Sequence, residues 1–301
     1  EFIRFFDTVL EKYDIDEKAL LRATNEYTKN KTQKNLETIS QLSEPGWREL
    51  FRRLNTISEG TLKLVRMRER IRSLKKDSPN LQFFDRSLLI LFKYWFNPSF
   101  LVLESIDWTT PANILEKIIA YEAVHEINSW DDLRARLAPA DRKCFAFFHP
   151  LMPNEPLIFV EVALTNNMPD SISEIIKIDR PITQEHDINT AVFYSISNCQ
   201  EGLSGISFGN FLIKNVAHKL KQENDDLDKF VTLSPMPGFS KWLDKKSIED
   251  YQDEDALIKQ VLVYLLESDR DDGLPNDHVA RFPIGNGAIL ERIKLNSVLS
   301  L

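Results

Sequence analysis

The 301 residues, 43% hydrophobic and 28% charged, are enough for a sizeable core and for two domains of ordinary size. The formal net charge of −8 argues against broad nucleic-acid binding; it divides into +5 over residues 1–100 (19 basic, 14 acidic) and −13 over residues 101–301 (19 basic, 32 acidic), which indicates two different surfaces. No apolar run reaches 18 residues, so we expect no membrane-spanning helix and no membrane partner.

The first part of the chain, residues 1–97, reads as one helix after another, and we expect a helical bundle domain there. Helices are expected over residues 2–10, 16–28, 45–54, 61–76 and 88–96. The segment 88–96 is apolar nearly all round, so it should be the central helix of the bundle.

After Pro98, strands alternate with helices, and residues 98–301 are expected to form a second domain. Strands are expected over residues 101–108, 143–148, 156–164, 191–197 and 230–233. Helices are expected over residues 111–121, 129–137, 208–220, 239–243 and 255–266. Residues 278–294 read as two hairpin strands around Gly285-Asn286-Gly287. With the helical first domain, this mixture predicts an α+β fold for the chain.

Three glycines, Gly202, Gly205 and Gly209, cluster between the expected strand 191–197 and helix 208–220. Backbone N–H groups there, with the partial positive charge of a helix N-terminus, could hold a diphosphate. The spacing is not the dinucleotide fingerprint Gly-x-Gly-x-x-Gly. It loosely resembles the Gln/Arg-x-x-Gly-x-Gly/Ala loop of acetyltransferase-like domains, which bind coenzyme A. A turn whose glycines serve sterics alone is the alternative.

Ser234 lies at the C-terminal end of the strand 230–233, before a turn made rigid by two prolines. Because ligands bind at strand ends in open α/β sheets, Ser234 could polarise a developing oxyanion or position a carboxylate. A serine that only caps the turn is the alternative. The chain has no Gly-x-Ser-x-Gly elbow, which argues against a hydrolase nucleophile.

Several motifs occur in order along the chain. They are Tyr121-Glu122-Ala123-Val124-His125, Glu155-Pro156-Leu157, Val162-Ala163-Leu164-Thr165, Phe193-Tyr194-Ser195-Ile196-Ser197, Gly202-Leu203-x-Gly205, Phe211-Leu212-Ile213-Lys214, Leu233-Ser234-Pro235-x-Pro237-Gly238-Phe239-x-Lys241-Trp242-Leu243 and Asn286-Gly287-Ala288. Over residues 85–293 the chain resembles the malonyl-CoA decarboxylase family, and its N-terminal helices resemble that family more weakly.

The resemblance implies a helical N-terminal domain, often used for homo-oligomer contacts, and an acetyltransferase-like C-terminal domain. It also implies an enzyme of fatty acid metabolism that converts malonyl-CoA to acetyl-CoA and CO₂ with no metal or organic cofactor. Ser234 matches the family's catalytic serine. The residues expected to bind coenzyme A are Gln200, Gly202, Leu203, Ser204, Gly205, Ser207 and Asn210, and those expected in the substrate pocket are His149, Pro283 and Asn286.

Position 283 departs from the family pattern, because Pro283 stands where the family has its catalytic histidine, three residues before Asn-Gly-Ala. Proline has no proton to give. His278, five residues earlier, replaces a proline of the family, and along a strand it would point to the opposite face. We take His278 as the catalytic histidine; His149, water or a tyrosine that the family supplies beyond Leu301 stay open as proton donors. A homologue that binds coenzyme A thioesters without decarboxylation, and an acyltransferase, are the alternative functions.

Other polar residues receive structural interpretations. Glu122 and His125 lack further ligands nearby for a metal site. Glu161 lies either on the solvent face of its strand or in a site, and we favour the solvent face. The basic run from Lys63 to Lys76 could attract the 3′-phosphate of coenzyme A or RNA, but a solvated helix face is favoured.

The two cysteines, Cys144 and Cys199, make neither a disulfide framework nor a Cys-x-x-Cys metal pair. Cys144 lies in an apolar run and is expected in the core. A reduced, cytoplasmic protein is expected. Because the sequence begins at Glu1, a preceding organelle-targeting segment stays open.

Overall fold

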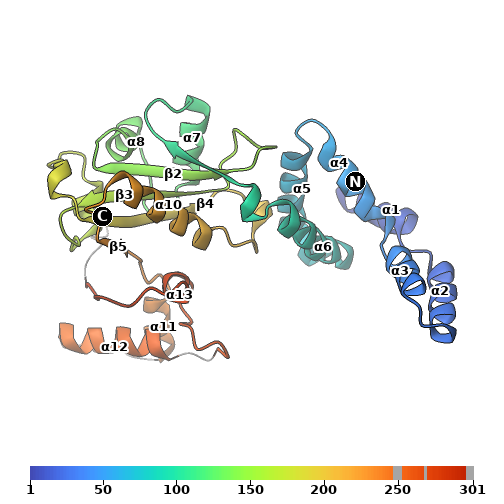
Figure 1. The fold of residues 1–301 in the computed structure, drawn as a ribbon. Helices are drawn as coiled ribbons and strands as arrows, with labels where there is room; N and C mark the ends of the chain where they lie inside the picture. The colour runs from blue at the N-terminus through green and yellow to red at the C-terminus, as the bar shows by residue number, and fades with distance from the viewer. Residues whose placement is uncertain (247–252, 268–269, 296–301) are drawn as a thin grey trace. The chain divides into compact units, whose positions relative to one another are not determined.

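The computed structural model describes residues 1–246, 253–267 and 270–295. The chain divides into two compact units, which we call the helical unit (Glu1–Phe100, His149–Pro153 and Gln200–Ile206) and the sheet unit (Leu101–Phe148, Asn154–Cys199 and Ser207–Leu301). A helical region followed by a mixed-sheet domain confirms the predicted α+β class (Figure 1). No helix in the described part of the chain is long and apolar enough to cross a membrane.

The helical unit contains α1 (Phe2–Tyr13), α2 (Glu17–Lys29), α3 (Gln33–Leu42), α4 (Gly46–Thr56), α5 (Gly60–Leu74) and α6 (Pro79–Trp95), with short 3₁₀ turns η1 (Lys75–Asp77), η2 (Pro98–Phe100) and η4 (Glu201–Leu203). Aromatic rings form its core: Phe6, Trp47 and Phe51 all contact the ring of Phe84. The predicted central helix begins earlier than residue 88, because Ser78 caps it by accepting a hydrogen bond from the Leu81 amide.

The sheet unit is built on five strands in the order β1-β2-β3-β4-β5: β1 (Val102–Ile106), β2 (Arg142–Phe148), β3 (Ile158–Thr165), β4 (Thr190–Asn198) and β5 (Lys229–Thr232). All neighbours are antiparallel except β4 and β5, which are parallel. The register of β3 and β4 shifts between Glu161 and Val162, so Tyr194 is the extra residue of a β-bulge. The predicted strands 101–108, 143–148, 156–164, 191–197 and 230–233 are confirmed to within a few residues.

Helices cover both faces of the sheet (Figure 1). On one face, α7 (Ala112–Tyr121) and α8 (Trp130–Leu137) pack on a cluster that includes Cys144, which is 2% exposed as the core prediction requires. On the other, Phe147 stacks on Phe211 of α10 (Gly209–Glu223), with ring centroids 5.5 Å apart. Because successive side chains of β2 point to opposite faces, both faces must be apolar, and β2 reads as a continuous hydrophobic run.

Shorter elements complete the unit: α9 (Ile172–Ile176), η3 (Glu185–Asp187), α11 (Phe239–Lys246), α12 (Glu254–Leu266) and α13 (His278–Gly285). Phe239, Trp242 and Tyr264 pack together and join α11 to α12. The Tyr264 hydroxyl donates a 2.6 Å hydrogen bond to Asp277, at the start of α13.

The predicted hairpin over residues 278–294 is wrong, because the segment begins with the helix α13. Asp277 caps that helix by accepting hydrogen bonds from the amides of Val279 and Ala280, each 2.9 Å long. Gly287, with φ +92°, ends it: the Gly287 and Ala288 amides donate to the carbonyls of Ile284 and Pro283. This is a Schellman helix end, which needs the same left-handed glycine as the predicted hairpin turn.

Candidate functional site

The glycine-rich loop packs within the helical unit against α5. Nη1 of Arg68 donates to the carbonyl oxygens of Gly202, at 2.7 Å, and Ser204, at 2.9 Å. Nε of the same guanidinium donates to Oδ1 of Asp85 at 3.0 Å. Arg68 is only 1% exposed, so the interpretation of the basic run as a solvated helix face is wrong at this residue.

Sterics explain why two positions of this loop are glycine. A Cβ at Gly202 would overlap the backbone oxygen of Val65, and Gly205 has φ +92°. Because the peptide bond is planar and trans, the Ser204 carbonyl that faces Arg68 directs the amide of Gly205 away from Arg68. The steric requirement and an outward-facing N–H group are therefore compatible.

In the sheet unit, α10 begins without a side-chain cap. Its N-cap residue, Phe208, makes no side-chain capping hydrogen bond. The first backbone hydrogen bond of the helix runs from the Leu212 amide to the Phe208 carbonyl, at 2.9 Å. Since the first N–H groups of a helix have no partners inside the helix, those of Gly209 and Asn210 suit an anion. Gly209 itself is needed because a Cβ would run into the ring of Phe282 on α13.

A hollow of about 350 Å³ lies between the start of α10 and α13. Ser207 and Asn210 line it from the α10 side, and Asn286 lines it just beyond α13. The α13 residues that line it are His278, Arg281, Phe282 and Gly285. Their spacing places them on one helical face. Four residues predicted as site residues thus meet in one place: Ser207, Asn210, His278 and Asn286.

Arg281 was not predicted as a site residue, because strands were expected there. Helical periodicity from His278 would have placed Arg281 and Phe282 beside it. The expectation that His278 and Pro283 point to opposite faces also assumed that this segment is a strand. On α13 the two lie five residues apart, about 140° around the helix, and Pro283 is not among the residues that line the hollow.

Ser234 and His149 are not among the lining residues of this hollow either. Ser234 is exposed just beyond β5, and its hydroxyl donates to the Thr232 hydroxyl at 3.4 Å. His149 lies in the helical unit, where Nε2 is 3.2 Å from the Trp95 carbonyl oxygen and Nδ1 accepts from the Leu151 amide. Burial lowers the pKa of His149, which favours the neutral imidazole.

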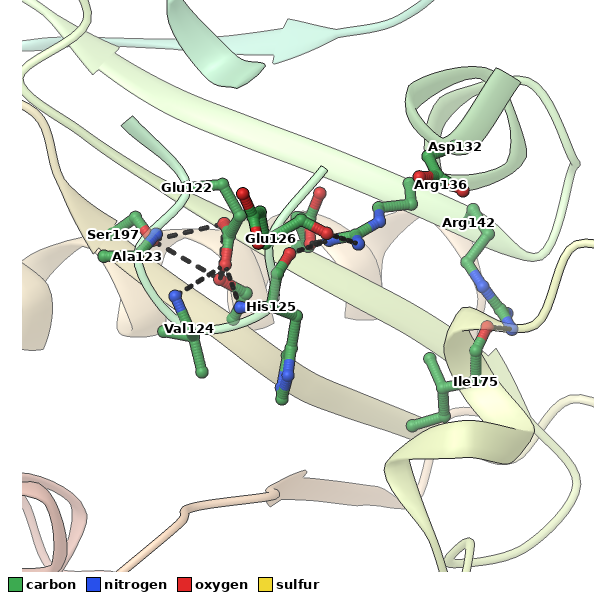
Figure 2. A network of polar contacts seen from close by, with 12 residues as sticks. Glu122, Ala123, Val124, His125, Glu126, Asp132, Arg136, Arg142, Ile175 and Ser197 are labelled. Atoms are coloured by element: carbon green, nitrogen blue, oxygen red, sulfur yellow. Dashed lines mark hydrogen bonds and ion pairs between the residues drawn. The ribbon is translucent and has the colours of Figure 1, made fainter. Parts of the chain in front are cut away.

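A polar network lies where the chain leaves α7 and crosses β4 (Figure 2). The Glu122 carboxylate accepts hydrogen bonds from the amides of Val124, at 2.9 Å, and His125, at 2.7 Å. The Ser195 hydroxyl donates to both Glu122 oxygens at 2.7 Å, and the Ser197 hydroxyl donates to Oε2 at 3.2 Å. Glu122 therefore holds the turn after α7 against β4, and no metal-binding cluster is found within the described ranges.

Glu161 lies beside this network, and its predicted solvent position is wrong: the residue is 0% exposed. Helices cover both faces of the sheet, so β3 offers no solvent face at this point. Oε2 is 3.2 Å from Nη1 of Arg136, which also donates to the His125 and Glu126 carbonyls. Burial raises the pKa of Glu161 to about 7, although Arg136 opposes the rise.

The sequence matches the models of one protein family over most of its length. The "Malonyl-CoA decarboxylase N-terminal domain" model matches residues 13–96, and the "Malonyl-CoA decarboxylase C-terminal domain" model matches residues 99–261. The mitochondrial malonyl-CoA decarboxylases of Anser anser anser and Mus musculus are 39% and 38% identical over 205 residues, 66% of this chain. That match covers 40% and 42% of those relatives, so the chain spans about two fifths of their length.

Two solved structures cover nearly all of the chain. The malonyl-CoA decarboxylase of Rhodopseudomonas palustris is 44% identical, with a TM-score of 0.85, over 95% of this chain and 76% of that one. The malonyl-CoA decarboxylase of Agrobacterium vitis is 42% identical, with a TM-score of 0.86, over 95% of this chain and 77% of that one.

Proposed function

Since the chain belongs to the malonyl-CoA decarboxylase family, we propose that it converts malonyl-CoA to acetyl-CoA and CO₂ with no metal or organic cofactor. One observation carries the proposal beyond family membership. Ser207 and Asn210, expected at the coenzyme A, and His278 and Asn286, expected at the reacting group, line the same hollow.

The proposed reaction needs three things from the protein. The bond between the α-carbon and the carboxyl carbon breaks, CO₂ leaves, and the electron pair passes into a thioester enolate that then takes a proton on the α-carbon. The site must therefore orient the carboxylate, stabilise the enolate oxygen and deliver a proton. We assign orientation or polarisation of the malonyl group to Ser234 and proton delivery to His278.

The assignment to His278 follows from its place on the lining face of α13. Water, and His149 in the helical unit, are the alternative donors.

For the coenzyme A portion, we propose the start of α10, in the sheet unit, as the pyrophosphate site. The loop from Gln200 to Gly205 belongs to the helical unit, and its role in binding coenzyme A stays a prediction from the sequence. Support comes from the uncapped helix, whose first N–H groups are available to an anion. Within the loop, the amides of Leu203 and Ser204 donate to the carbonyls of Gln200 and Glu201. The carbonyls of Gly202 and Ser204 accept from Arg68, so the Gly205 amide is the loop donor that faces away from Arg68.

Two alternatives remain distinct from this proposal. Pro283 in the histidine position supports a homologue that binds coenzyme A thioesters without decarboxylating them. An acyltransferase on the same fold would need a second cleft for an acceptor and a base beside it.

One assay separates the three functions: incubation with malonyl-CoA, with acetyl-CoA followed over time. We expect turnover that falls at least about a hundredfold in Ser234→Ala, by analogy with the loss of one oxyanion donor. Ser240→Ala, at an exposed serine of α11, should leave turnover unchanged. Binding by calorimetry without turnover indicates the non-decarboxylating homologue, and Pro283→His gaining activity would locate its defect. Acetyl transfer to an added amine indicates the acyltransferase.

We also propose a domain boundary between residues 97 and 98, and a homo-oligomer formed through the helical domain. The matches to the two family domains, which end at residue 96 and begin at residue 99, support the boundary. Exposed apolar side chains on the helical unit support the oligomer, among them Leu21, Leu36 and Ile90. Light scattering tests it. For location we propose the cytoplasm; the mitochondrial relatives make an organelle the alternative.

A further inference from the structure

Arg281 lines the hollow between α10 and α13 without an ion-pair partner among the described residues. The hydrogen bond from Arg270, and to a smaller extent the charge of Arg281, lowers the pKa of the Asp272 carboxyl. That carboxylate is already paired with Arg270, whose Nε lies 2.9 Å from Oδ1 of Asp272. No carboxylate lines the hollow, although the chain as a whole carries a net charge of −8. An arginine in such a place has five N–H donors and no acidic acceptor.

A second hollow shows how different the surroundings of an arginine can be. It has a volume of about 530 Å³, and its lining includes four carboxylates: Asp170, Glu174, Asp228 and Glu291. Its arginine, Arg292, lies 2.8 Å from Oδ1 of Asp170 and is therefore already neutralised. Of these two hollows, the one at α13 has the guanidinium that is available to an anion from outside the chain.

We propose that Arg281 binds the free carboxylate of a dicarboxylic acyl thioester and so selects malonyl-CoA over acetyl-CoA. This inference rests on the proposed function. In malonyl-CoA the α-carbon that takes the proton is directly bonded to the carboxyl carbon, so the group that binds the carboxylate and the group that delivers the proton must lie close together. His278 and Arg281 meet this requirement, because they lie one helical turn apart on the lining face of α13.

The same contact has a chemical cost for decarboxylation. The negative charge begins on the carboxylate, beside Arg281, and moves to the enolate while CO₂ leaves without charge. The ion pair is therefore stronger in the bound substrate than in the transition state, and such an interaction improves binding while it lowers kcat. Arg281 therefore determines which thioester binds and lowers the rate of the decarboxylation that follows binding.

Calorimetric titration with malonyl-CoA, acetyl-CoA and free coenzyme A tests the proposal. Every chain in this comparison carries Ser234→Ala, so that malonyl-CoA is not consumed during the measurement. For Arg281→Met we expect a Kd for malonyl-CoA raised roughly tenfold to a hundredfold, the range for a charge-assisted hydrogen bond, with the other two ligands changed by less than about twofold. Arg281→Lys should fall between. Arg292→Met, at the paired arginine, serves as the matched control and should bind all three as the Ser234→Ala chain does.

Two results would overturn the inference: equal weakening of all three ligands, which would place a phosphate of coenzyme A on Arg281, or no weakening. The Ser234→Ala chain alone also decides, since an acetyl-CoA Kd no higher than the malonyl-CoA Kd contradicts the selection even if the Arg281 variants fail to fold. The proposed function fails separately: tight malonyl-CoA binding that depends on Arg281 without any acetyl-CoA product would refute decarboxylation and leave the inference standing.

Kinetics give a second readout that a merely structural role would not produce. If the wild type turns over, Arg281→Met should raise KM and also raise kcat, since the lost ion pair favoured the ground state. A fall in kcat with unchanged KM would contradict this role.

Discussion

At the scale of single residues, Glu161 shows what alternation along a strand cannot reveal. Its neighbours Val160 and Val162 are buried, and the two-residue period then places Glu161 on the opposite face. Helices cover that face, and the residues next to Glu161 in the sequence do not indicate this. The ion partner, Arg136, comes from α8, 25 residues away.

This buried carboxyl makes a pH-dependent prediction. The pKa of Glu161 rises from 4.5 to about 7 on folding, so between these values the folded chain holds a proton that the unfolded chain has lost. The contribution of Glu161 to the free energy of unfolding is greatest below about pH 4.5, decreases as the pH rises, and stays constant above about pH 7. Glu161→Gln should remove this slope, about 1.4 kcal/mol per pH unit.

Denaturant unfolding at pH 5, 6 and 7 measures that slope. Glu104→Gln, at an exposed glutamate of β1, is the matched control and should keep the wild-type slope. Parallel slopes for wild type and Glu161→Gln would show that Glu161 does not change its protonation on folding.

Glu122 makes a second prediction at this scale. Its carboxylate is the acceptor for two amides and two serine hydroxyls, so Glu122→Ala leaves those donors unpaired. We expect a loss of about 2–4 kcal/mol in the free energy of unfolding, and a smaller loss for Glu122→Gln. Glu126→Ala, an exposed glutamate on the same turn, is the control. Equal losses for Glu122→Ala and Glu126→Ala would contradict the anchoring role.

At the scale of elements, α5 contributes more than a basic surface. Arg68 joins α5 to Asp85 of α6 and to the loop carbonyls of Gly202 and Ser204. We expect Arg68→Met to lower the free energy of unfolding by about 2–4 kcal/mol, because the two loop carbonyls lose their buried donor and Asp85 keeps only Lys75, 2.8 Å away. In the fraction that remains folded, coenzyme A should bind more weakly because the loop has lost its support.

Arg70→Met, an exposed position of α5 where the guanidinium lies 4.6 Å from the ring centroid of Phe2, is the control for both measurements. Arg68→Lys should recover part of the coenzyme A affinity. If coenzyme A binds folded Arg68→Met as tightly as wild type, the loop does not depend on Arg68.

The segment after Asp277 shows an element that the sequence left ambiguous. Asn286-Gly287 suits a two-residue hairpin turn and a Schellman helix end equally, because both place glycine at positive φ. The aspartate cap and the contact of Phe282 with Gly209 favour the helix. The second of these joins residues more than 70 positions apart, which no local pattern records.

For the whole molecule, the α+β class and the order of the five strands could be predicted from hydrophobic periodicity, since it depends on neighbours in sequence. The helix α3 was not predicted, and α13 was predicted as strands. The site could be predicted only in part. The sequence predicted Ser207, Asn210, His278 and Asn286 as site residues. It could not predict that they line one hollow together with Arg281, because this depends on how α13 packs on α10. The burial of Arg68 also depends on tertiary packing, because the loop from Gln200 to Ile206 packs on its guanidinium.

The most direct test of the central claim is the fate of malonyl-CoA, measured by mass spectrometry of all coenzyme A species during incubation with the chain. We predict that acetyl-CoA appears in a one-to-one ratio as malonyl-CoA disappears, and that Ser234→Ala suppresses this while Ser240→Ala does not. Malonyl-CoA that stays intact while bound, or that yields free coenzyme A instead, would contradict the claim.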